Sequence, residues 1–206
     1  KIPLELPTPG ERLLKIHVQT QLPSLMLGFN VPSIATAKDP ITANALRLIS
    51  ALLDGGYSAR MPTQVERGEE LVSGASSSYN AFTRGDSLFV LSAVPNTQKK
   101  KTLAEVESGV WKLLDELKTT PPTAEELERV RAQVIAGLVY DRDSISSQAT
   151  TIGQLETVGL SWKLIDKELD ELKSVTPADI QSAARTYFTR DRLSVAHVLP
   201  EEQAHD

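Results

Sequence analysis

Apolar residues alternate with polar or small ones in several short segments, which is the pattern of strands in a sheet. In the first segment, Leu14, Ile16 and Val18 alternate with Lys15 and His17. A polar, glycine-containing stretch, 80–86, separates two of the segments and predicts that they pair antiparallel. The strands are predicted within residues 14–18, 25–31, 71–79, 88–94 and 193–196.

Elsewhere, apolar residues recur every three or four positions and predict helices. Asp39 followed by Pro40 is a typical helix start, and Gly55 with Gly56 ends the helix of residues 40–54. Thr123 with Glu126 predicts a capping box, and Thr176, Pro177 and Asp179 predict the start of the last helix. The helix opened by Thr123 has a predicted buried stripe of Leu127, Val130, Val134 and Leu138, and the other helices are predicted at 58–67, 103–117, 146–158, 162–173 and 177–188.

Strands at the beginning and the end, with a block of helices between them, predict an α+β fold. We expect a mainly antiparallel sheet with the helices packed on one face. Residues 1–21 are interpreted as a leader or linker that includes the first strand, and residues 22–206 as one domain. Because the sequence starts at Lys1 without methionine, we expect it to be a piece of a longer polypeptide.

Composition narrows the classes of function. The 206 residues are 40% hydrophobic and 24% charged, which is typical of a folded domain, and no apolar run is long enough to span a bilayer. The net charge of −5 disfavours general nucleic-acid binding. The absence of cysteine excludes disulfides, thiolate nucleophiles and cysteine-based metal sites.

The histidines lack the motifs that catalysis or zinc binding requires. His17, His197 and His205 are too far apart for two of them to share successive turns of one helix. We favour structural or solvent-exposed roles for all three, with a role as ligand or base as the alternative. The residues alone therefore show no complete catalytic apparatus and no metal site.

Four segments together resemble a known family. Residues 52–60, Leu-Leu-Asp-Gly-Gly-Tyr-Ser-Ala-Arg, resemble the helix end and turn of the non-catalytic half of pitrilysin/insulinase-type zinc metallopeptidases. Residues 122–131, 144–149 and 175–188 resemble helices of the same domain. The resemblance covers about residues 22–199, and its strength lies in the order and spacing of the segments.

In that family, two homologous halves close like a clamshell around a peptide, and one half carries the zinc motif His-x-x-Glu-His. Matching the glycine after the helix places Leu46, Ile49 and Ser50 where that motif has its two histidines and glutamate. The resemblance therefore implies that this helix binds no zinc. Leu46 and Ile49 are also ordinary core positions of an amphipathic helix.

Non-catalytic halves of the family often supply an arginine and, seven residues later, a tyrosine to the substrate. Here the two positions fall on Glu66 and Ser73, or in another register on Gln64 and Leu71, so the pair is missing. Arg60 and Arg67 are the candidate substitutes for substrate binding. The alternative is that they are solvated partners of nearby glutamates.

The resemblance implies the C-terminal, non-catalytic half of a bacterial zinc protease, which encloses an extended peptide while a zinc-bearing half hydrolyses it. That partner half, in the same chain or in a separate subunit, would hold the zinc, and this half would need no cofactor. The alternative is a pseudo-enzyme that serves as a scaffold or assembly module. We expect a periplasmic location rather than a cytoplasmic one, because bacterial members of the family are frequently exported. For the isolated domain, a homodimer is one of the oligomeric states that the sequence leaves open.

Overall fold

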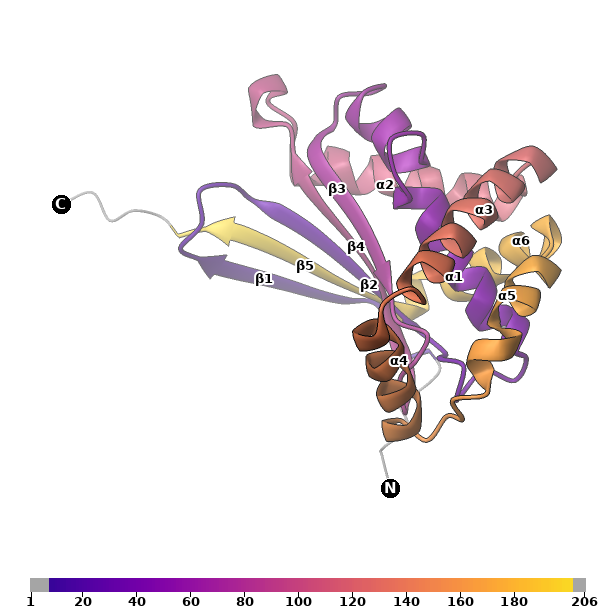
Figure 1. Ribbon diagram of the computed structural model, residues 1–206. Helices are drawn as coiled ribbons and strands as arrows, with labels where there is room; N and C mark the ends of the chain where they lie inside the picture. Colours follow the sequence, from indigo (N-terminus) through magenta and orange to yellow (C-terminus); the bar gives the residue numbers. More distant parts are fainter. Residues whose placement is uncertain (1–7, 202–206) are drawn as a thin grey trace.

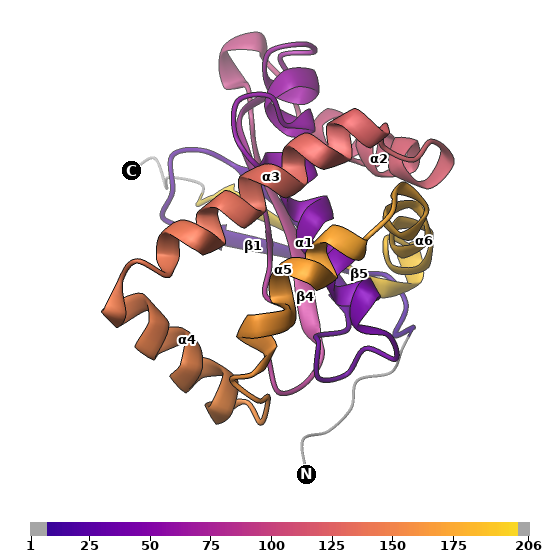
Figure 2. The same ribbon diagram turned by 45° about the vertical axis from the view of Figure 1, so that its right-hand side comes forward.

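The computed structural model describes residues 8–201, which form one five-stranded sheet with helices on one of its faces (Figures 1 and 2). The strand order is β1-β5-β2-β4-β3, and only the outer pair β1·β5 is parallel. The α+β fold with a mainly antiparallel sheet is thereby confirmed. The strands are β1 (Arg12–Val18), β2 (Ser24–Val31), β3 (Val72–Tyr79), β4 (Ser87–Pro95) and β5 (Leu193–Pro200).

Local capping signals account for the helix starts. Asp39 accepts a hydrogen bond from the Ile41 backbone N–H, and Thr176 and Asp179 form a reciprocal capping box at the predicted start of the last helix. The α-helices are α1 (Pro40–Asp54), α2 (Leu103–Thr119), α3 (Ala124–Asp141), α4 (Ile145–Thr157), α5 (Leu164–Ser174) and α6 (Pro177–Tyr187), and the short helices are η1 (Met61–Glu66), η2 (Thr97–Lys99) and η3 (Arg190–Arg192). None of the helices within residues 8–201 has the length and apolarity to cross a bilayer.

Two local predictions were wrong. The segment 58–67 does not form an ordinary helix but a six-residue π-helix, η1. At the start of α3, the Thr123 side chain caps the Glu126 backbone, but the Glu126 carboxylate does not return the bond and instead binds Arg60. The bonds to Arg60, a residue distant in the sequence, therefore replace the second bond of the local capping box.

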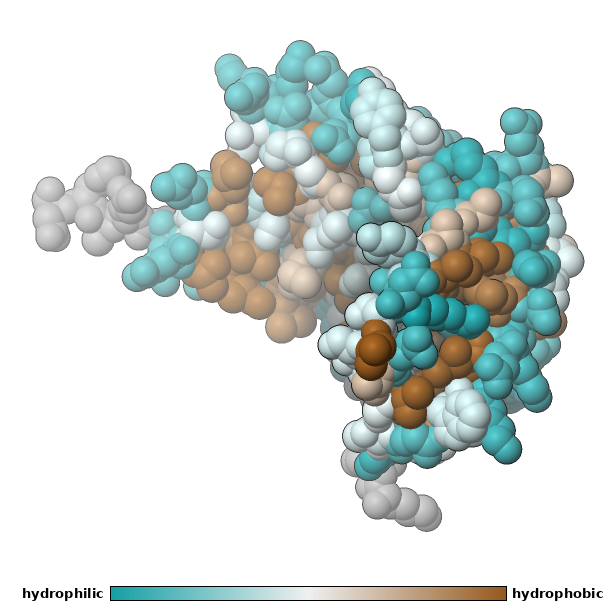
Figure 3. Space-filling model, in the orientation of Figure 1, coloured by the Kyte–Doolittle hydropathy of each residue, from teal (hydrophilic) through white to brown (hydrophobic). Residues whose placement is uncertain are grey.

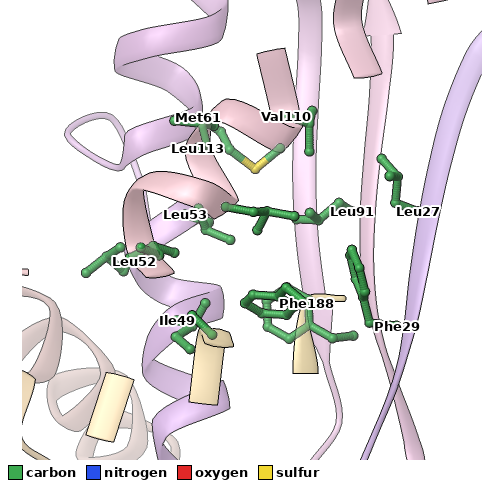
Figure 4. Close-up of a cluster of buried hydrophobic side chains, with 14 of the residues drawn as sticks. Leu27, Phe29, Ile49, Leu52, Leu53, Met61, Leu91, Val110, Leu113 and Phe188 are labelled. Carbon is green, nitrogen blue, oxygen red and sulfur yellow. The ribbon is translucent and has the colours of Figure 1, made fainter. Parts of the chain in front are cut away.

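The core lies between the sheet and the helices, and α1 and α2 supply most of its helical side chains (Figure 4). Phe188, at the end of α6, packs against Phe29 of β2 and Phe89 of β4, with ring centroids 5.2 and 4.9 Å apart. Leu48 and Leu52 of α1 are 0% and 1% exposed, as the helical pattern predicts. These contacts attach the helical layer to the sheet.

The predicted buried stripe of α3 is only half correct. Leu127 and Val130 are 1% exposed, whereas Val134 and Leu138 are only partly buried. The first half of α3 lies over α1, but its second half extends towards α4, which leaves a hollow there.

The N-terminal strand belongs to the sheet. β1 lies inside the segment that the sequence assigns to a leader, and it pairs along its whole length with β5, from Arg12 opposite Ser194 to Val18 opposite Pro200. The domain boundary after residue 21 stays a prediction.

Candidate functional site

Helix α1 occupies the place where the resemblance puts a zinc motif. Leu46 and Ile49 are 0% exposed and lie in the core, where their hydrocarbon side chains offer no lone pair to a metal. Ser50 is bonded to the edge strand β3, because its backbone carbonyl accepts from the Ser77 hydroxyl (2.8 Å) and the two hydroxyl oxygens are 3.0 Å apart. The three positions therefore serve packing and helix–sheet attachment.

A second bond ties the end of α1 to the same edge strand. The Asp54 carboxylate accepts a hydrogen bond from the Ser77 backbone N–H at 3.1 Å. This edge N–H is then not available to pair with an added peptide strand. Sequence reasoning missed Ser77, because its partners lie 23 and 27 residues away and no local pattern signals them.

Arg60, the first candidate substrate-binding residue, is engaged inside the domain. Its Nε and Nη2 atoms donate to the two carboxylate oxygens of Glu126, each at 2.9 Å, and the side chains are only 14% and 22% exposed. These hydrogen bonds, assisted by the Arg60 charge, lower the pKa of Glu126 against the opposing effect of burial. Arg60 thus joins the turn after α1 to the start of α3.

Arg67, the second candidate, is exposed and lies against an aromatic ring. Its Nη2 donates to the Tyr57 carbonyl at 2.7 Å, and its guanidinium lies 3.6 Å from the centroid of the Tyr57 ring. Tyr57 is 77% exposed. The neighbouring glutamates bind elsewhere, Glu69 to Lys112 and Glu70 to Lys99.

The two alignment registers lead to different environments. Glu66 is partly buried at the end of η1, and Ser73 is exposed on β3 with its hydroxyl 3.4 Å from the Val94 carbonyl. In the other register, Leu71 is 7% exposed and packs in the core beside the partly buried Gln64. Neither pair of positions provides a cation and a phenol.

His17 and His197 lie on neighbouring strands and are not opposite each other in the register. His17 is exposed on β1, whereas His197 on β5 has its Nε2 atom 3.6 Å from the Glu107 carboxylate, and His205 lies outside the described residues. Within the part of the chain that the structure describes, no three acidic or histidine side chains are grouped to hold a metal ion.

The sheet face away from the helices, here called the open face, carries small and apolar side chains. The strand registers place Leu14, Ala196, Met26, Ser92 and Ser76 in one row across all five strands. The parallel row is Arg12, Ser194, Gly28, Val90 and Ser78, so ten positions contain a single charge.

This face stays accessible at its β1 side. Leu14 is 50% exposed, Ile16 39% and Met26 41%. Figure 3 shows apolar side chains gathered where β1 and β5 extend beyond the helices. The open face thus consists mainly of small and apolar side chains and carries almost no charge.

The class of protein defined by these features is an α+β domain with helices on one face of the sheet, a nearly uncharged open face and no histidine or glutamate at the three motif positions of α1. A family model described as "Peptidase M16 inactive domain" matches residues 1–134. The chain belongs to this family. None of the curated proteins matches it significantly.

Solved structures share the fold at low sequence identity. A protease from Helicobacter pylori has 22% identity and a TM-score of 0.84 over 96% of this chain and 46% of that one. The inactive peptidase domain of a protein assigned as a zinc protease, from Bordetella parapertussis, has 17% identity and a TM-score of 0.78 over 93% of this chain and 97% of that one. The periplasmic protease PqqL from Escherichia coli has 15% identity and a TM-score of 0.68 over 94% of this chain and 21% of that one. The chain thus spans about half of the Helicobacter pylori protease.

Proposed function

We propose that this chain is the non-catalytic half of a zinc peptidase, and that its open face forms one wall of a chamber that encloses an extended peptide. The observation that carries the proposal is the pair of cross-sheet rows, which contain one charge in ten positions. A wall of this kind accepts unfolded peptides of varied sequence, because it has few groups that would have to be paired or desolvated.

The zinc and its activated water would belong to a homologous partner half, since α1 has hydrocarbon side chains at two of the three motif positions. Zinc there would act as a Lewis acid and lower the pKa of a bound water. A second wall would hold the peptide in register and exclude bulk water, which strengthens electrostatic interactions at the metal. The likeness in fold to a periplasmic protease supports a periplasmic location for the assembled protein.

Arg67 and Tyr57 are the proposed substitutes for the missing arginine and tyrosine. They are stacked together, and both lie in the segment that connects α1 to β3. Arg60 is a weaker candidate, because its Nε and Nη2 atoms already bind Glu126.

The test uses the zinc-bearing half joined to this domain and a quenched fluorescent peptide. Met26→Glu places a charge at the centre of the open face, and Ala136→Glu places the same charge on the exposed side of α3. We expect Met26→Glu to lower kcat/KM about tenfold at unchanged stability, since an apolar contact is replaced by an unpaired carboxylate. Ala136→Glu should leave kcat/KM unchanged.

The scaffold function is the alternative, and the internal engagement of Arg60 favours it. It predicts that the zinc-bearing half alone hydrolyses the peptide as fast as the joined protein. In that case Met26→Glu would also leave kcat/KM unchanged, and the enclosing role would be wrong.

A further inference from the structure

A hollow of about 300 Å³ lies between α3, α4 and α5, on the side of the molecule that faces the viewer in Figure 2. It is separate from the open face of the sheet. Helix α4 buries only Leu155, so that Ile152 is 39% exposed and Ile145, at the start of the same helix, is 86% exposed. Figure 3 shows apolar side chains between α4 and α5.

The floor of the hollow is apolar. Leu138 of α3, Ile152 of α4 and Ile165 of α5 line it from three sides. The same arrangement leaves the second half of the α3 stripe only partly buried. Hydrocarbon that remains in contact with water on three converging helices favours an apolar occupant.

The rim of the hollow is acidic. Asp141, Asp166 and Glu168 line it, and the one lining base, Arg142, donates to the Ile165 carbonyl at 2.7 Å. Glu168 pairs with Arg47 at 2.6 Å, whereas Asp141 and Asp166 have no ion pair or side-chain hydrogen bond within residues 8–201. Two unpaired carboxylates beside an apolar floor complement an apolar group next to a cation.

We propose that this hollow is a docking groove for a basic amphipathic helix of a partner protein. Such a helix places apolar side chains at every third or fourth position into the groove and its lysine or arginine side chains on the acidic rim. A second copy of this chain is a poorer occupant, because it also carries a net charge of −5. The groove residues lie beyond residue 134, where the family match ends, and the proposal does not depend on peptide enclosure.

The test measures fluorescence anisotropy of a labelled designed helix of about five turns, with leucine on one face and lysine on the other, on titration with the 206-residue chain. Matched peptides carry glutamate in place of lysine, or the same residues in scrambled order. We expect binding of the leucine–lysine helix alone, weakened by salt.

Variants of the chain then locate the site. Asp141→Asn with Asp166→Asn should weaken binding about tenfold, and Ile152→Ala severalfold, because rim charge and apolar contact both contribute. The control Glu125→Gln with Asp191→Asn makes the same change in net charge at exposed positions outside the groove and should bind normally. Circular dichroism checks that each variant is folded.

Three results would overturn the proposal. The first is no binding of the leucine–lysine helix at about 1 mM, which corresponds to less than about 4 kcal/mol of binding free energy. The second is equal weakening by the control variant, which would show a non-specific charge effect. The third is self-association of the chain that Ile152→Ala abolishes, which would identify a second copy as the occupant.

Discussion

The pair Arg60–Glu126 should be a measurable contributor to stability, because it joins segments 66 residues apart through two hydrogen bonds of 2.9 Å. A hydrogen bond to a charged group contributes about 1.5–3 kcal/mol when it is buried. The two side chains are 14% and 22% exposed, so solvent reduces this value. We therefore expect a coupling free energy of about 1–2 kcal/mol for the pair.

A double-mutant cycle isolates that coupling. The variants are Arg60→Met, Glu126→Gln and both together, and urea denaturation at pH 7 gives the free energy of unfolding of each. The double variant should lose less stability than the sum of the single variants. Arg131→Met provides a comparison, because that arginine also binds α3, α5 and the following turn but not Glu126.

The pH dependence gives an independent check. Hydrogen bonds from Arg60 lower the pKa of Glu126 in the folded protein below the value of an unfolded glutamate, about 4.3. The contribution is therefore fully present above the unfolded pKa and is lost as the pH falls through the lower, folded pKa. A coupling below about 0.3 kcal/mol at pH 7, or one that is unchanged at about pH 2, would refute this reasoning.

Three further predictions concern the core, the turn after α1 and metal binding. Leu48→Ala and Leu52→Ala should each cost about 2–5 kcal/mol of stability in thermal or urea denaturation, whereas Leu88→Ala, at a 54% exposed position, should cost little. Gly56→Ala should cost about 1–3 kcal/mol, because Gly56 has φ +110° in a region that other residues rarely adopt, although its missing side chain has open space. Metal analysis after dialysis should find no stoichiometric zinc in the 206-residue chain; one tightly bound zinc that is lost in His17→Ala or His197→Ala would show that the histidines were misjudged.

The sequence predicts best what is decided locally. Asp39 with Pro40, and Thr176 with Asp179, each fix a helix start through bonds within three residues, and both are found as expected. The antiparallel pair β3·β4 is likewise connected through a short loop. Partners that are distant in the sequence cannot be predicted from such local signals. The parallel pairing of β1 with β5 joins the two ends of the chain, and no spacing in the sequence specifies it.

The candidate site shows the same limit. The sequence shows which residues stand at the motif positions of α1 but cannot tell which arginine is engaged. Arg67 has Glu66, Glu69 and Glu70 close by in the sequence, yet it stacks on Tyr57. Arg60 has no glutamate within five residues, yet it binds Glu126 of α3. Only the fold decides between these partners.

In helix α1, the three positions of the family's zinc motif hold residues that contribute to the fold. Leu46 and Ile49 are fully buried in the core, and Ser50 bonds the helix to β3. A histidine or glutamate in the first two positions would be buried without a partner, which costs several kcal/mol. The side of α1 that would have to bind zinc is therefore the side that stabilises the fold.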